Sequence, residues 1–194
     1  MLKDIILKNR SCRRFFEDYN IDRKGLEELV DLARLSPSAG NVQPLKYILS
    51  CDSEKNAQVF STLAWAGYLE DWSGPEVGER PSAYIIILGD KELKPKFTWD
   101  HSIAATSIVF GAAEKGLAGC ILAAIDRKKL CQSLNISDRY EILLVIALGK
   151  GKEKIQIDAL GIDGDIKYWR DKNGTHHVPK RSLDSIILDY TLEG

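Results

Sequence analysis

Leu35-Ser36-Pro37-Ser38-Ala39-Gly40-Asn41-Val42-Gln43-Pro44 is the stretch of this sequence that decides the fold. Pro37 disfavours the helical conformation of the residue before it, so a helix that enters the stretch must end by Ser36. Glycine and small side chains let backbone N–H groups approach a ligand, and Asn41 and Gln43 each offer a hydrogen-bond donor and an acceptor. The stretch is therefore either a ligand-binding loop or a plain connection between a helix and a strand.

The segments on either side of this loop carry periodic apolar residues. Upstream, Asp22 is a candidate helix cap, and the apolar residues between 26 and 33 fall on one helical face. Met1 to Arg10 alternates apolar and polar residues, which predicts a short amphipathic helix. Downstream we expect a strand at 47–49, a helix capped by Ser53 that runs toward Trp65, and an irregular loop from Glu70 to Pro81.

The second half of the chain predicts alternating strands and helices, and then changes in composition. We expect strands at 84–88, 121–123 and 142–148, the first of them buried on both faces. Residues 100–115 predict a central buried helix that ends at Gly116, whose small residues could pack against a neighbour or a second copy of the chain. Asp126 predicts a capped basic helix. Glycine, lysine and aspartate dominate from Gly149 to a short terminal helix near Ser182, and the pattern favours an α/β or α+β fold.

Composition excludes several classes of protein. The 194 residues suit one domain, and the formal net charge of −1 does not favour nucleic-acid binding. No apolar run is long enough to cross a membrane, and no signal peptide is evident, so we expect a cytoplasmic protein with four reduced cysteines. The adjacent His176 and His177 would point to opposite faces of a strand, and we therefore expect no metal site. His101 is expected to be a residue of a helix N-terminus rather than a member of a catalytic triad.

Two basic clusters complete the chemistry that the residues suggest. Arg10-Ser11-Cys12-Arg13-Arg14-Phe15 places three cations and a hydroxyl together, and His177-Val178-Pro179-Lys180-Arg181 adds two more cations. Each could be a solvated charged segment, but guanidinium groups also suit phosphate or carboxylate. There is no Gly-x-Gly-x-x-Gly, Walker-type or Gly-x-Ser-x-Gly motif. Cationic and amide-rich clusters without an acid–base set indicate a cofactor that brings its own chemistry.

The order of these motifs resembles the FMN-dependent nitroreductase family. The similar elements are residues 9–15, the loop at 35–44, Ala112 to Cys120, and residues 178–183, which together span nearly the whole chain. The resemblance implies an α+β fold with a central, mainly antiparallel sheet flanked by helices, in an intertwined homodimer. It implies one domain over residues 1–194 whose C-terminal extension, from about 150 to 194, packs on the partner subunit.

The resemblance also implies where FMN would be held. Arg10 and Ser11, with Lys180 and Arg181, would hold the phosphate and ribityl chain, and Arg13 would approach the pyrimidine end of the ring, where positive charge raises the flavin potential. Many relatives have two basic residues before the serine, whereas this chain has Asn9-Arg10. The full set of implied cofactor-binding residues is Arg10, Ser11, Arg13, Arg14, Pro37, Ser38, Ala39, Asn41, Gln43, Gly119, Cys120, Ile121, Lys180 and Arg181.

The implied activity is ping-pong two-electron reduction of nitroaromatics, quinones or similar electron-poor acceptors by NADH or NADPH, with no dedicated catalytic residue. The same fold could instead serve reductive dehalogenation, ene reduction or flavin fragmentation, or a non-catalytic role in flavin binding or storage. Trp65, Tyr68 and Trp72 could shape an acceptor pocket, although aromatic residues at helical spacing are more often core residues.

Overall fold

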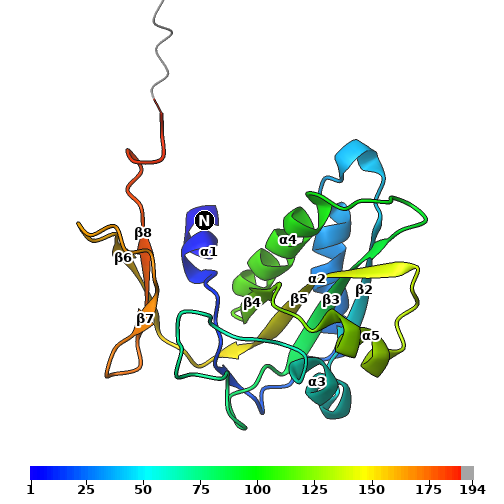
Figure 1. Cartoon of the computed structure of the whole chain (residues 1–194), viewed down its shortest axis with the longest axis horizontal. Helices are drawn as coiled ribbons and strands as arrows, with labels where there is room; N and C mark the ends of the chain where they lie inside the picture. The colour runs from blue at the N-terminus through cyan, green and yellow to red at the C-terminus, as the bar shows by residue number, and fades with distance from the viewer. Residues whose placement is uncertain (189–194) are drawn as a thin grey trace, which may run out of the picture.

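The computed structural model, described here for residues 1–188, is built around a five-stranded antiparallel sheet (Figure 1). The strand order is β1-β5-β3-β2, and β4 also pairs with β5. The strands are β1 (Phe15–Phe16), β2 (Leu45–Ser50), β3 (Ala83–Asp90), β4 (Ala118–Leu122) and β5 (Tyr140–Gly151). The prediction of an α+β fold with a mainly antiparallel sheet is confirmed.

Helices cover both faces of this sheet, so its central strands are buried on both sides. The helices are α1 (Leu2–Lys8), α2 (Arg23–Leu35), α3 (Ser53–Phe60), α4 (Asp100–Glu114) and α5 (Arg127–Leu134). Ile85 and Ile87 of β3 pack with α2 and α4, whereas Tyr84, Ile86 and Leu88 pack in a second core with residues of α3 and α5. Every residue of β3 is buried, as its continuous apolar run predicts.

Two of the five helices in the described residues begin at the capping residues that the sequence predicts. Asp22 Oδ1 accepts a hydrogen bond from the Gly25 amide at 2.8 Å, and Asp126 caps α5 in the same way. The expected cap of α3 is wrong, because Asp52 rather than Ser53 accepts from the Lys55 amide. That helix also ends at Phe60 and does not run on toward Trp65. A strand-like bridge between Leu63 and Ile125 takes its place.

Helix α4 packs closely against α2 of the same chain. A Cβ added at Gly111 would overlap the side chain of Leu32 in α2, so only glycine permits this approach. At Gly111, therefore, a small residue of α4 serves an intrachain contact. Gly116 follows the helix with φ of +72°, which glycine adopts without strain.

A second, three-stranded sheet follows β5 and was not predicted from the sequence. It consists of β6 (Ile155–Ala159), β7 (Trp169–Arg170) and β8 (His176–Lys180), with β6 parallel and β7 antiparallel to β8. Figure 1 draws this small sheet apart from the main sheet, with α1 between them. The expected terminal helix is also wrong for the described residues, because residues 183–186 form only a turn. The first residue of β8, His176, contacts Arg13, so β8 lies beside the N-terminal segment.

Candidate cofactor-binding site

The N-terminal segment, β4 and β8 enclose a cavity of about 350 Å³. Ser11 forms a bridge with Gly119, and the Cys12 amide donates to the Gly119 carbonyl at 3.1 Å, so the basic segment runs beside β4. Six of the residues implied by the family resemblance line this one cavity: Arg10, Ser11, Arg13, Gly119, Ile121 and Lys180. Asn9, Val109, Tyr168, His176 and Val178 complete the lining.

Three cations face this cavity, and none forms an ion pair with a carboxylate within residues 1–188. Arg10 donates to the carbonyls of Asn9 and Ile6, at 2.6 and 2.8 Å, at the C-terminal end of α1. The Arg13 guanidinium contacts neutral groups, and Lys180 at the end of β8 closes the opposite side. Uncompensated positive charge around a cavity favours an anionic ligand such as a phosphate.

Arg13 is held by contacts on three sides, with Ser11, His176 and Tyr168. Its side chain is only 9% exposed, and Nη1 donates to the Ser11 carbonyl and to His176 Nε2, each at 3.2 Å. The guanidinium also lies 4.8 Å from the centre of the Tyr168 ring, a cation–π contact. Because an arginine can only donate, His176 must accept at Nε2 and carry its proton on Nδ1. Burial lowers the pKa of His176, which keeps the ring neutral.

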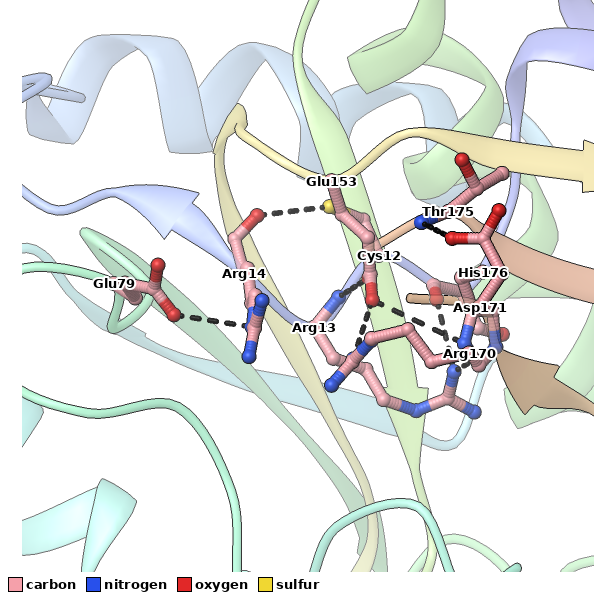
Figure 2. Close-up of polar contacts among 10 residues, drawn as sticks. Cys12, Arg13, Arg14, Glu79, Glu153, Arg170, Asp171, Thr175 and His176 are labelled. Carbon is pink, nitrogen blue, oxygen red and sulfur yellow. Dashed lines mark hydrogen bonds and ion pairs between the residues drawn. The ribbon is translucent and has the colours of Figure 1, made fainter. Parts of the chain in front are cut away.

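Glu153 is the buried anion of this network. Its side chain is 1% exposed and accepts from the Arg13 backbone amide at 2.9 Å and from Arg170 Nη2 at 2.6 Å. Figure 2 shows the carboxylate between these donors. Sequence reasoning missed Glu153, Tyr168, Arg170 and His176 as site residues. They lie in a segment whose composition resembles a charged tail, and only the small sheet brings them to the cavity.

Eight implied cofactor-binding residues lie outside this lining, and three of them belong to the basic clusters and β4 rather than to the loop at 36–44. Arg14 pairs with Glu79 at 3.1 Å. Cys120, within β4, points into the core shared with α3 and α5, and burial raises the pKa of its thiol to about 11, so it is not a reactive thiolate at neutral pH. Arg181 is exposed beyond the end of β8.

The loop at 36–44 lines a different cavity, of about 150 Å³, between α2, β2 and α4. Of its implied cofactor-binding residues, Pro37, Ser38 and Gln43 line that cavity, while Ala39 and Asn41 are exposed beside it. Within one chain, the loop and the basic segment therefore do not share a cavity.

Asp100, the first residue of α4, anchors this loop and was not identified as a site residue from the sequence. Its Oδ1 accepts from Ser38 Oγ at 2.6 Å and from the Ala39 amide at 3.0 Å, and Lys94 pairs with Oδ2 at 3.2 Å. Burial acts to raise the pKa of Asp100, but these hydrogen bonds outweigh it and lower the pKa. The buried carboxylate thus holds the loop in one conformation.

The three aromatic residues considered for an acceptor pocket have different environments. Trp65 is buried in the core beside Phe60. Tyr68 is exposed and lies 5.0 Å from Tyr168, measured between ring centres, so it stands next to a residue that lines the cofactor cavity. Arg170 lies over the ring of Trp72.

Comparison with known proteins identifies relatives over most of the chain. A model of the nitroreductase family matches residues 6–150. A putative NAD(P)H nitroreductase of Bacillus subtilis is 23% identical over 189 residues, which cover 76% of this chain and 87% of that protein. The crystal structure of a nitroreductase family protein from Streptococcus pneumoniae covers 98% of this chain and 100% of its own, with a TM-score of 0.70 and 19% identity.

A second solved structure carries a cofactor. The crystal structure of a putative nitroreductase from Exiguobacterium sibiricum in complex with FMN covers 79% of this chain and 89% of its own, with a TM-score of 0.65 and 16% identity. At this identity the likeness concerns the fold. In the described part of this chain, no helix is long and apolar enough to span a membrane.

Proposed function

The chain belongs to the nitroreductase family, an oxidoreductase family, and from this premise we propose that it binds FMN and reduces small electron-poor acceptors with NADH or NADPH. The acceptors we propose are nitroaromatics and quinones. The observation that carries the proposal is the convergence of Arg10, Arg13 and Lys180 on one cavity without a carboxylate partner among the described residues.

The lining of this cavity fits the two chemically distinct parts of FMN. Arg10, Ser11 and Lys180 offer the cations and the hydroxyl that a phosphate requires. Ile121 and Val109 supply an apolar surface suited to a flat ring, and Arg13 supplies a fixed positive charge. Bound FMN would accept two electrons as hydride from the nicotinamide and then pass them to an acceptor that occupies the same space after the donor has left.

The chain's own residues would position and polarise the cofactor rather than transfer protons. His176 Nε2 is occupied by Arg13, so the one histidine at the cavity is not free to act as a base. The Arg13 charge would stabilise negative charge on a reduced ring and so favour reduction. Solvent would supply the protons.

We further propose that the site is completed by a second subunit. Helix α1 has no buried residue although it is amphipathic, and Leu2, Ile6 and Leu7 are exposed. An apolar helix face of this kind favours a protein partner. A homodimer in which the C-terminal extension, from about residue 150, packs on the partner would bring the partner's 36–44 loop to the flavin edge.

The proposal predicts that FMN added to the FMN-free protein binds and is reduced anaerobically by NADH or NADPH. Arg10→Ala should mainly weaken FMN binding, whereas Arg13→Ala should lower the flavin potential and slow reduction. Arg23→Ala is a matched control, since Arg23 pairs with Glu27 on an exposed face of α2. A protein that takes up no FMN would refute the proposal. Bound FMN that neither nicotinamide reduces would instead favour a flavin-binding role without turnover.

A further inference from the structure

A second polar cavity, of about 270 Å³, shares no lining residue with the cofactor cavity. Three segments form it: residues 17–20 after β1, the start of α3, and the approach to β3 from Arg80 to Tyr84. Its floor is Tyr84, which packs in the core with α3 and α5. No part of the proposed function uses this cavity.

The cavity contains polar atoms that have no partner among residues 1–188. Tyr84 is fully buried, and its hydroxyl has no hydrogen-bond partner in that part of the chain. Ser82 Oγ and Arg80 Nε are buried and likewise have no partner among the described residues. Most buried polar groups in proteins are hydrogen-bonded, so three unpartnered groups around one cavity indicate that something else binds them.

These three groups share one property, which is that each can donate a hydrogen bond. The Arg80 guanidinium lies 4.3 Å from the centre of the Phe60 ring and forms no ion pair within the described residues. Burial raises the pKa of Tyr84, so its hydroxyl keeps its proton. A cation with two neutral hydroxyl groups is a donor set suited to carboxylate oxygens.

The neighbouring groups restrict which anion would fit. Asn56 is already engaged, because it donates to the Ser82 carbonyl at 2.7 Å and accepts from Ser50 Oγ at 2.8 Å. Glu17 and Asp18 line the same cavity, but Glu17 already accepts from the amides of Gly78 and Arg80, and Asp18 is exposed. Arg80 is the one cation among the described lining residues, so a second negative charge on the ligand would face these carboxylates with no cation to balance it. Phe60 and Ala57 offer apolar surface to the rest of the molecule.

We propose that this cavity binds a small monocarboxylate, with its carboxylate on Arg80, Tyr84 and Ser82 and its apolar part against Phe60. Dianions such as succinate, and inorganic phosphate at pH 8, should bind more weakly, because Arg80 is the one cation in the described lining. The site is separate from the cofactor cavity, so ligand binding there requires neither FMN reduction nor turnover.

The test is isothermal titration of the FMN-loaded protein at pH 8, where inorganic phosphate and succinate are dianions, with 3-methylbutanoate, inorganic phosphate and succinate, together with the melting temperature in each. We expect 3-methylbutanoate to bind and to raise the melting temperature, and the two dianions to bind at least about tenfold more weakly. Absence of 3-methylbutanoate binding, or equal binding of the dianions, would overturn the proposal.

Two variants link the binding to the unpartnered donors. Arg80→Gln should weaken binding of 3-methylbutanoate by at least about tenfold. Tyr84→Phe removes only the hydroxyl, so we expect the ligand-free protein to keep its melting temperature while the ligand-induced rise becomes smaller. Tyr19→Phe, at an exposed position of the cavity rim, is the matched control. Unchanged binding in both Arg80→Gln and Tyr84→Phe would show that the ligand lies elsewhere.

Discussion

Replacement of Glu153 by glutamine should destabilise the protein far more than replacement of an exposed carboxylate. The Glu153 side chain is 1% exposed and that of Arg170 is 14% exposed, with 2.6 Å between Oε1 and Nη2. Glutamine preserves the shape and can still accept from the Arg13 amide, but it leaves the Arg170 charge without its anion. The substitution therefore isolates the ion pair.

The size of the effect follows from this burial. Removing one partner of a buried ion pair costs about 3–5 kcal/mol, and the partial exposure of Arg170 places Glu153→Gln near the lower end, at about 3 kcal/mol. In a chain of this length, that loss lowers the melting temperature by about 6–12 °C. FMN affinity should also fall, because the Arg13 backbone and side chain are held by the same network.

The assay is urea unfolding of the FMN-free protein, followed by tryptophan fluorescence at one protein concentration so that subunit association does not vary. Glu27→Gln is the control, since Glu27 pairs with Arg23 on an exposed helix face and should cost at most about 0.5 kcal/mol. A loss of less than about 1 kcal/mol in Glu153→Gln would refute the view that this pair stabilises the small sheet against the N-terminal segment.

Three further predictions concern pH, the loop and helix packing. Folding lowers the pKa of His176 from its unfolded value of 6.5. Between pH 6.5 and the pKa of the folded state, the unfolded chain therefore binds a proton at His176 that the folded chain does not bind. Stability should therefore be fully present above pH 6.5 and fall as the pH drops through that window; urea midpoints should fall less in His176→Gln. Asp100→Asn should weaken FMN binding by about tenfold through loosening of the 36–44 loop, because a hydrogen bond to a charged group is worth about 1.5–3 kcal/mol. An unchanged affinity in fluorescence titration would contradict this. Gly111→Ala should cost about 1–3 kcal/mol in urea unfolding through overlap with α2, whereas Gly67→Ala, where a Cβ meets nothing within 4 Å, should change little.

The elements predicted most accurately from the sequence are those with local physical causes. Asp22 and Asp126 cap helices because their side chains bond amides three residues away, and Pro37 lies just beyond the end of α2 for steric reasons. The continuous apolar run at 84–88 predicts strand β3, because a strand that is buried on both faces needs apolar residues at successive positions. Each of these signals lies within a few residues of the structure it determines.

The errors have equally specific causes. Asp52 and Ser53 are both good capping residues, and the local pattern does not distinguish them. The strands of the small sheet are short, and two of them follow a polar, glycine-containing segment. The sequence therefore shows no apolar–polar alternation long enough to predict these strands. Three apolar residues, Leu183, Ile186 and Ile187, predict the terminal helix, but they lie on and just after a turn.

The residues of the implied FMN site also fall into two groups, those predicted from local motifs and those that only the tertiary structure brings to the site. The sequence by itself determined the family, the basic residues at 10–13 and the loop at 35–44, because motifs are local and survive as ordered residue types. Only the tertiary structure decided that Lys180 faces Arg10, that a buried Glu153 carboxylate and a neutral His176 hold Arg13, and that the loop lines a separate cavity. The contacts around Arg13 and Lys180 join residues more than 100 positions apart. The burial that sets the strength of the Arg13 contacts and the protonation of His176 arises only when the small sheet meets the N-terminal segment.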